Sequence, residues 1–341
     1  MTTYDDRRLW PGTVPPVAGS PERRPGSVRR TTNVDLVRPD GPTGPLVVLG
    51  AGRDLHTGSA GGGVLAQAAT EVAIDYLGGR IVRSVMTDPV VDGVEALVGA
   101  RVGSGFRRTL AEALPDLARG HGLVHLLLDE LTPATLISGS TLAREGAVAL
   151  AGGPGATMPI DICAGWVADG AMVHAIADTG IPLLGWGPPA PSLDRPGDPD
   201  AWHPMPVLAP RSMRRRRLLD VGAGPASGPA GDSDELLVQV RFRDSYWEAD
   251  GTETVVHEYG VTARVDPSTW LVTGAEAVPG PLPAPECPSA AASAGRLVGR
   301  RVDDLREVVR AELTGVSTCT HLNDVFRSLA DIPDLWTAAA R

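Results

Sequence analysis

The chain has 341 residues, 43% of them hydrophobic and only 4% aromatic, with a formal net charge of −10. This length can hold two domains of ordinary size, and the composition is typical of a soluble globular protein whose core rests on Val, Leu and Ala. The acidic balance argues against nucleic-acid binding, and no run reaches the roughly 20 apolar residues of a membrane span. The N-terminus lacks the apolar segment of a signal peptide, so we expect a cytoplasmic protein.

Residues 1–26 are rich in Pro, Gly and Arg and are predicted to be a mobile tail. A first unit then spans residues 27–149, in which strands come first and helices afterwards. Its expected elements are strands at 46–49, 71–75 and 81–86, a hairpin turn at Gly78-Gly79, and helical spacing from Phe106 to Leu117.

Residues 150–211 form a connector, Pro-rich in its second part, that we expect to cover a pocket or the interface between the two units. A second unit spans residues 212–341 and repeats the order of strands followed by helices, which predicts an α+β fold. Its expected elements are strands at 236–242, 258–265 and 270–273, a turn at 266–269, and helices at about 288–299, 303–313 and 320–330.

The two units share short sequence matches that occur in the same order. The matches pair Ser27-Val28-Arg29-Arg30 with Ser212-Met213-Arg214-Arg215, Arg53-Asp54 with Arg243-Asp244, and the run 97–102 with the run 297–302. The order holds over about a hundred residues, which predicts a tandem duplication. The first copy carries no cysteine, so we interpret it as degenerate, and we interpret the arginine pairs that open the copies as features of edge strands.

The second copy carries the candidate site residues His257, Cys287, Cys319 and His321. Thiolate and imidazole are the ligands that suit zinc or an iron or iron–sulfur centre, so this set predicts a metal site. Glu258, next to His257, is an alternative ligand. The structural alternatives are inert buried cysteines and histidines that serve only the core.

Both cysteines stand where helices are expected to begin. Cys287 precedes Pro288, and Cys319 precedes Thr320, a residue type favoured at helix N-termini. Because a helix dipole stabilises a thiolate at its N-terminus, we expect both thiols to have lowered pKa values.

The second copy resembles an uncharacterised bacterial family of domains of unknown function. The resemblance rests on Cys319-Thr320-His321-Leu322, Glu286-Cys287-Pro288 and His257-Glu258, spans about residues 212–332, and implies no activity.

The layout is also similar to the NifU-type iron–sulfur cluster scaffold. In this comparison Cys287 and the following residues match the helix opened by that family's second cysteine, the run 297–305 matches its middle element, and Cys319 matches its third cysteine. The first cysteine and the lysine-rich docking segment are absent. The resemblance therefore implies a scaffold-like fold and ligand shell, and it does not imply cluster assembly.

Three functions follow from these residues. The first is a metal-binding protein with zinc or iron held by the second copy. The second is a metal-free enzyme for a small organic substrate, with Cys319 as nucleophile or acid/base and His321 or His257 as its partner. The third is a pseudo-scaffold that binds a protein partner.

Overall fold

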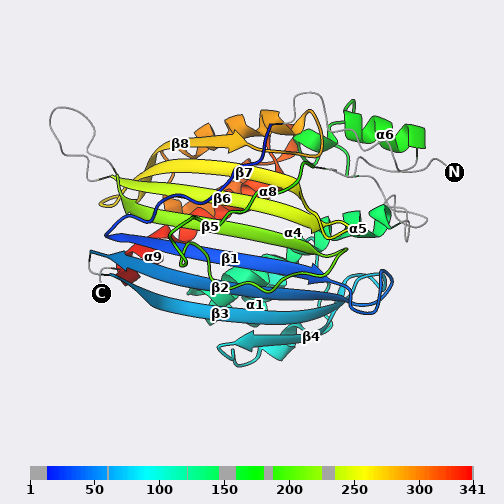
Figure 1. Cartoon of the computed structure of the whole chain (residues 1–341), viewed down its shortest axis with the longest axis horizontal. Coiled ribbons are helices and arrows are strands. Elements are labelled where there is room, and N and C mark those ends of the chain that lie inside the picture. Colours follow the sequence, from blue (N-terminus) through cyan, green and yellow to red (C-terminus); the bar gives the residue numbers. More distant parts are fainter. Residues whose placement is uncertain are drawn as a thin grey trace.

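The computed structural model describes residues 14–59, 61–120, 122–145, 159–179, 187–224 and 235–339. Within these residues the chain forms one antiparallel sheet of eight strands in the order β4-β3-β2-β1-β5-β6-β7-β8 (Figure 1). The strands are β1 (Ser27–Val37), β2 (Leu46–Gly58), β3 (Gly61–Asp75), β4 (Ile81–Asp88), β5 (Met213–Ala223), β6 (Leu236–Trp247), β7 (Glu253–Asp266) and β8 (Leu271–Pro279). We call the described residues up to 145 the first half and those from 213 onward the second half.

Helices follow the strands in each half and cover one face of the sheet (Figure 1). Those of the first half are η1 (Val94–Leu97), α1 (Phe106–Ala113), α2 (Pro115–Arg119), α3 (Leu123–Asp129), α4 (Leu131–Ile137) and α5 (Gly139–Arg144). Those between the halves are η2 (Ala164–Trp166) and α6 (Ala171–Thr179). Those of the second half are η3 (Cys287–Leu297), η4 (Val302–Asp304), α7 (Leu305–Glu312), η5 (Gly315–Ser317), α8 (Thr320–Ser328), η6 (Leu329–Asp331) and α9 (Ile332–Ala339). None of the described helices is long and apolar enough to cross a membrane.

Two hydrophobic cores form between the sheet and these helices. Alternate residues of a strand face the same side of a sheet, so Val238, Val240 and Phe242 of β6 all point toward the helices of the second half. In the first half Leu46 and Val48 of β2 belong to a separate cluster with the helices that follow it. The two cores exchange a few residues, since Val28 of β1 belongs to the core of the second half and Met213 of β5 belongs to the core of the first.

Buried ion pairs lie on the helix-covered face and connect the two halves. Arg30 of β1 bonds both carboxylate oxygens of Asp54 at 2.7 Å, and it also bonds Asp331 at the end of η6 at 2.6 Å. Asp331 belongs to the second half. Asp331, which lies between two helices of the second half, therefore pairs with an arginine on a strand of the first half.

A second ion pair connects the halves in the opposite sense, from Arg215 on β5 of the second half to an acid of the first half. Arg215 bonds Asp244 of β6 at 2.8 and 3.1 Å, and it bonds Glu130, between α3 and α4 of the first half, at 2.9 Å. Asp244 has no exposed side-chain area. Because a buried charge is costly unless it is paired, these contacts fix how the two halves meet.

The opposite face of β1 and β5 carries a second reciprocal set of pairs. Arg29 bonds Asp220 at 2.6 Å, and Arg214 bonds Asp35 at 2.6 Å. Since β1 and β5 are neighbours at the centre of the sheet, the expectation that the arginine pairs mark edge strands is wrong. The arginines are tolerated at the centre because each is paired with an acid on a neighbouring strand.

Residues 187–211 run across this second face of the sheet (Figure 1). His203 lies between two side chains of β1, with Nδ1 2.8 Å from Thr31 Oγ1 and Nε2 2.7 Å from Asn33 Oδ1. The Pro206 carbonyl accepts a hydrogen bond from Arg214 at 2.7 Å. This segment therefore covers the line along which β1 and β5 meet.

Most predicted elements are present, and most are longer than predicted. The turn at 266–269 connects β7 and β8, and the stretch from 288 to 299 is a 3-10 helix, η3. Of the predicted tail, residues 14–26 contact the sheet, as where the Val17 amide bonds Glu258 at 2.7 Å. Several predicted segments lie outside the described residues: 1–13 of the tail, 146–158 at the boundary of the first unit and the connector, and 180–186 of the connector.

Candidate metal centre

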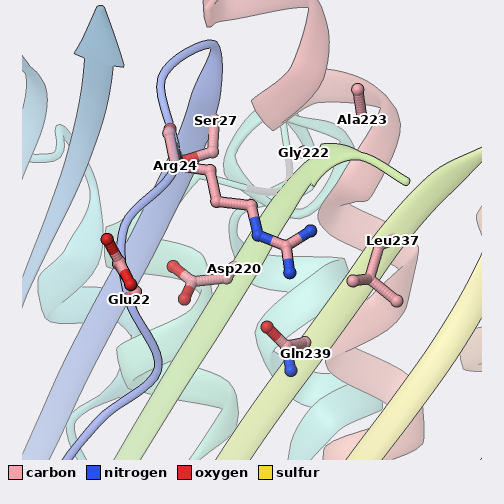
Figure 2. Close-up of a pocket in the computed structure, with 8 residues that line it drawn as sticks. All are labelled: Glu22, Arg24, Ser27, Asp220, Gly222, Ala223, Leu237 and Gln239. Carbon is pink, nitrogen blue, oxygen red and sulfur yellow. Dashed lines mark hydrogen bonds between the residues drawn. The ribbon is translucent and has the colours of Figure 1, made fainter. Parts of the chain in front are cut away.

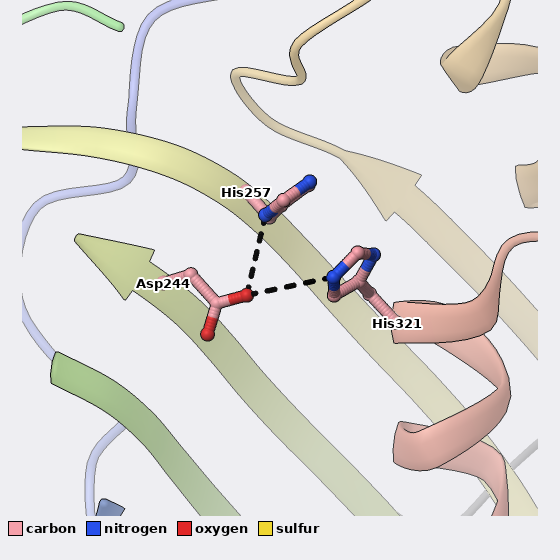
Figure 3. Close-up of side chains that lie close together, drawn as sticks. All are labelled: Asp244, His257 and His321. Carbon is pink, nitrogen blue, oxygen red and sulfur yellow. Dashed lines mark ion pairs between the residues drawn. The ribbon is translucent and has the colours of Figure 1, made fainter. Parts of the chain in front are cut away.

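Three side chains from three elements converge on the helix-covered face of the second half (Figure 3). Asp244 lies on β6, His257 lies directly opposite it on β7, and His321 is the second residue of α8. One ligand atom from each of the three lies within 4.8 Å of the others. His257 Nδ1 is 3.2 Å from Asp244 Oδ2, and His321 Nε2 is 4.0 Å from the same oxygen.

The local backbone geometry orients these three side chains toward one another. A bulge in β6 and β7 directly follows the Asp244–His257 pair, and both residues face the helices at that point. Leu322, Val325 and Phe326 of α8 are buried in the core of the second half, which fixes the first turn of α8 above the strands. The imidazole rings of His257 and His321 stack with centroids 3.8 Å apart and planes 22° apart.

Electrostatics keep Asp244 ionised. Burial opposes its charge, but the attraction of Arg215 and His257, with the hydrogen bonds from Arg215, outweighs burial and holds the pKa of Asp244 well below its ordinary range. Arg215 in turn is balanced by Glu130. Asp244 is thus a carboxylate with a fixed orientation at neutral pH.

His321 is a neutral imidazole. Burial, together with repulsion from His257 and Arg215, lowers its pKa well below the ordinary value despite the attraction of Asp244. Among the described residues, neither His257 Nδ1 nor His321 Nε2 has a hydrogen-bond partner of good geometry, although both face Asp244 Oδ2. Imidazole nitrogens that face one carboxylate oxygen without forming a well-aligned hydrogen bond to it are available to a metal ion when they are deprotonated.

The two candidate cysteines occupy different places. Cys319 immediately precedes α8, and its Sγ lies 3.8 Å from His321 Nδ1, the ring nitrogen that faces away from Asp244. Cys287 begins η3 and is buried in the core of the second half, outside the three converging groups. The expectation of lowered thiol pKa values is wrong. Burial raises the pKa of Cys319 to about 11 and raises that of Cys287 further, because desolvation outweighs the favourable backbone contacts at both helix starts.

Glu258, the alternative ligand, points to the opposite face of the sheet. Its carboxylate bonds Arg243 at 2.6 Å and accepts the amide of Val17. Successive residues of a strand face opposite sides, so Glu258 and His257 cannot both face the cluster in this register.

A small surface pocket lies elsewhere, where β5 ends and β6 begins, on the side of the sheet away from the helices (Figure 2). It is lined by Glu22, Arg24, Ser27, Asp220, Gly222, Ala223, Leu237 and Gln239. Figure 2 shows the Arg24 side chain reaching across it toward Gln239. The pocket shares no residue with the Asp244–His257–His321 cluster.

A family model described as a protein of unknown function (DUF2889) matches residues 226–333. The second half is therefore similar to an uncharacterised family, as the resemblance in the sequence predicts. No curated protein and no solved structure matches the chain. The likeness to the NifU-type scaffold consequently stays a prediction.

Asp244 is the residue that the sequence interpretation missed. Its match to Asp54 in the first half marked it as a residue of the fold. The sequence could have identified Asp244 through the register of the β6–β7 hairpin. That register places Asp244 directly opposite His257.

Proposed function

We propose that the protein binds one zinc or iron(II) ion through Asp244, His257 and His321. The observation that carries this proposal is the convergence of one carboxylate oxygen and two buried imidazole nitrogens within 4.8 Å of one another. Two histidines and one carboxylate are a ligand set used by both metals in proteins. The proposal keeps two of the four ligands expected from the sequence and replaces the cysteines with Asp244.

The donors suit a single ion better than an iron–sulfur cluster, which requires several thiolates. Arg215 engages the carboxylate of Asp244 from one side, and a carboxylate has about four lone-pair positions, so one remains for a metal. The Cys319 sulfur would accept a hydrogen bond from Nδ1 of His321 and so orient the ring, as groups next to metal ligands commonly do. Three protein ligands leave a position at which a bound ion could activate water or polarise a small organic substrate.

Elemental analysis of protein purified without a tag tests the proposal. We expect about one equivalent of zinc or iron per chain, and we expect His257→Ala and His321→Ala each to weaken binding at least tenfold in competition with a chelating dye. His174→Ala is the matched control, because His174 lies on α6 with its side chain 60% exposed. A metal-free protein that binds neither added Zn²⁺ nor Fe²⁺, or full binding by both site variants, would refute the proposal.

A second candidate function, a metal-free enzyme, has one specific observation in its favour. Cys319, His321 and Asp244 lie in the order nucleophile, base and acid, with 3.8 Å from Sγ to Nδ1 and 4.0 Å from Nε2 to Oδ2. The raised pKa of Cys319 speaks against it, since a thiol with a pKa of about 11 is almost entirely protonated at neutral pH. Rapid alkylation of Cys319 at pH 7 in a metal-free protein would favour this function over the first.

We also infer that the two halves descend from one duplicated unit. Support comes from bulges that follow Asp54 on β2 and Asp244 on β6, and from the reciprocal ion pairs across β1 and β5. Reciprocal contacts of this kind are typical of two equivalent units related by a two-fold axis. In this alignment Ala66 faces Asp54 where His257 faces Asp244, so only the second half has the histidine.

A further inference from the structure

One segment of the sheet has an uncovered edge. Strand β4 pairs with β3 only from Ala69 to Asp75, so residues Gly61–Ala68 have β2 on one side and no described strand on the other. We call these eight residues the β3 edge. A strand edge that exposes backbone donors and acceptors is a template for pairing with another strand.

The corresponding segment of the second half is covered. The first residues of β7 also extend beyond β8, but residues 188–190 lie beside them, with Val255 N bonding Pro188 O at 3.0 Å and Ala190 N bonding Glu253 O at 2.8 Å. The same chain thus supplies an extended segment at one of two equivalent positions. Among the described residues, nothing plays that role at the β3 edge.

The sequence of the β3 edge also lacks the usual protection. The outermost strands carry charge or proline, with Arg83 and Asp88 on β4 and Glu276 and Pro279 on β8, and such residues discourage pairing between molecules. The β3 edge reads Gly-Gly-Gly-Val-Leu-Ala-Gln-Ala and has neither charge nor proline. Val64 is 52% exposed and Leu65 is 40% exposed.

We propose that the β3 edge pairs with the β3 edge of a second copy of this chain, in antiparallel orientation across a two-fold axis, to make one sheet through two molecules. Charge argues for a second copy, because two uncharged segments can lie opposite each other without like-charge pairs. The geometry argues for it as well. An antiparallel strand pair has the two-fold symmetry of an isologous dimer, so one surface serves both partners.

Light scattering after size exclusion, over a range of concentrations, tests the proposal. We expect the wild type to reach the molar mass of two chains, and we expect Leu65→Lys and Leu65→Glu each to give single chains. An equimolar mixture of the two variants should associate more strongly than either variant alone, because each strand pair then brings together segments of opposite rather than like charge. Val278→Lys, at a 58% exposed position on β8, is the matched control and should remain dimeric.

Hydrogen exchange locates the contact independently of mass. The amides of the β3 edge should exchange more slowly at concentrations where the wild type is dimeric than in Leu65→Lys, while the helices exchange equally in both. A wild type that stays a single chain at every concentration overturns the proposal. So does a dimer that survives both Leu65→Lys and Val64→Pro, or one that Val278→Lys dissociates equally.

Discussion

Acidification should destabilise the protein through His203. Burial, together with the positive charges of Arg53 and Arg214, lowers the pKa of His203 to about 4 from an ordinary value of 6.5. The unfolded chain therefore binds a proton at a pH where the folded chain does not. Stability contributed by the neutral imidazole is complete above pH 6.5 and is lost as the pH falls toward 4.

The size of this effect follows from the shift. Each pKa unit corresponds to about 1.4 kcal/mol, so the full loss is about 3 kcal/mol, and about 2 kcal/mol of it should appear between pH 8 and pH 5. The structural reason is that both ring nitrogens of the buried imidazole are engaged, one with the Thr31 hydroxyl and one with the Asn33 carboxamide oxygen.

Urea unfolding of the wild type and of His203→Gln at pH 8 and pH 5 measures the effect. His203→Gln should be less stable at pH 8, because it cannot make both contacts, yet it should lose about 2 kcal/mol less than the wild type on acidification. The exposed substitution His174→Gln controls for the loss of a histidine and should keep the wild-type dependence. Equal pH dependence in the wild type and His203→Gln would refute the reasoning.

Two further substitutions test the packing and the ion pairs. Gly165→Ala would place a methyl group 2.6 Å from Cys287 Sγ and should lower the free energy of unfolding by about 1–3 kcal/mol in thermal denaturation. Gly295→Ala, whose methyl group would meet nothing within 4 Å, should be near neutral. Similar costs for the two variants would contradict the contact at Gly165. Asp331→Ala removes the acid that pairs with Arg306 and one of the two acids that pair with Arg30, which keeps Asp54. It should cost about 3–5 kcal/mol in urea, against less than about 1 kcal/mol for Asp303→Ala in an exposed pair. A small effect at Asp331 would show that the network does not hold the halves together.

Much of the fold could be predicted because it depends on local patterns. Alternation of apolar and polar residues marked β2, β3, β6 and β7, and the spacing from Phe106 onward marked α1 and α2. The position of β1 and β5 could not be predicted in this way. Arginines at successive positions look solvent-exposed, and only their partners on other strands, such as Asp220 and Asp35, show that they are central.

The candidate site was predicted in part for the same reason. His257 and His321 were noted as reactive residue types, but their common partner Asp244 depends on strand register and helix placement, which are tertiary features. The prediction of lowered thiol pKa values failed because burial, which raises them, depends on the folded structure and cannot be read from the sequence. A helix N-terminus favours thiolate only where the sulfur keeps some solvent or a positive partner, and Cys319 lies in the core.

Glu130 gives the first half, which has Ala66 at the position equivalent to His257, a part in the proposed site of the second half. Its carboxylate bonds Arg215, which bonds Asp244, so the orientation of the proposed ligand depends on a residue from the other half of the chain. A substitution of Glu130 in the first half should therefore disturb the proposed site in the second half. The second half carries the proposed ligands, and the first half supplies a buried acid that fixes the arginine beside one of them.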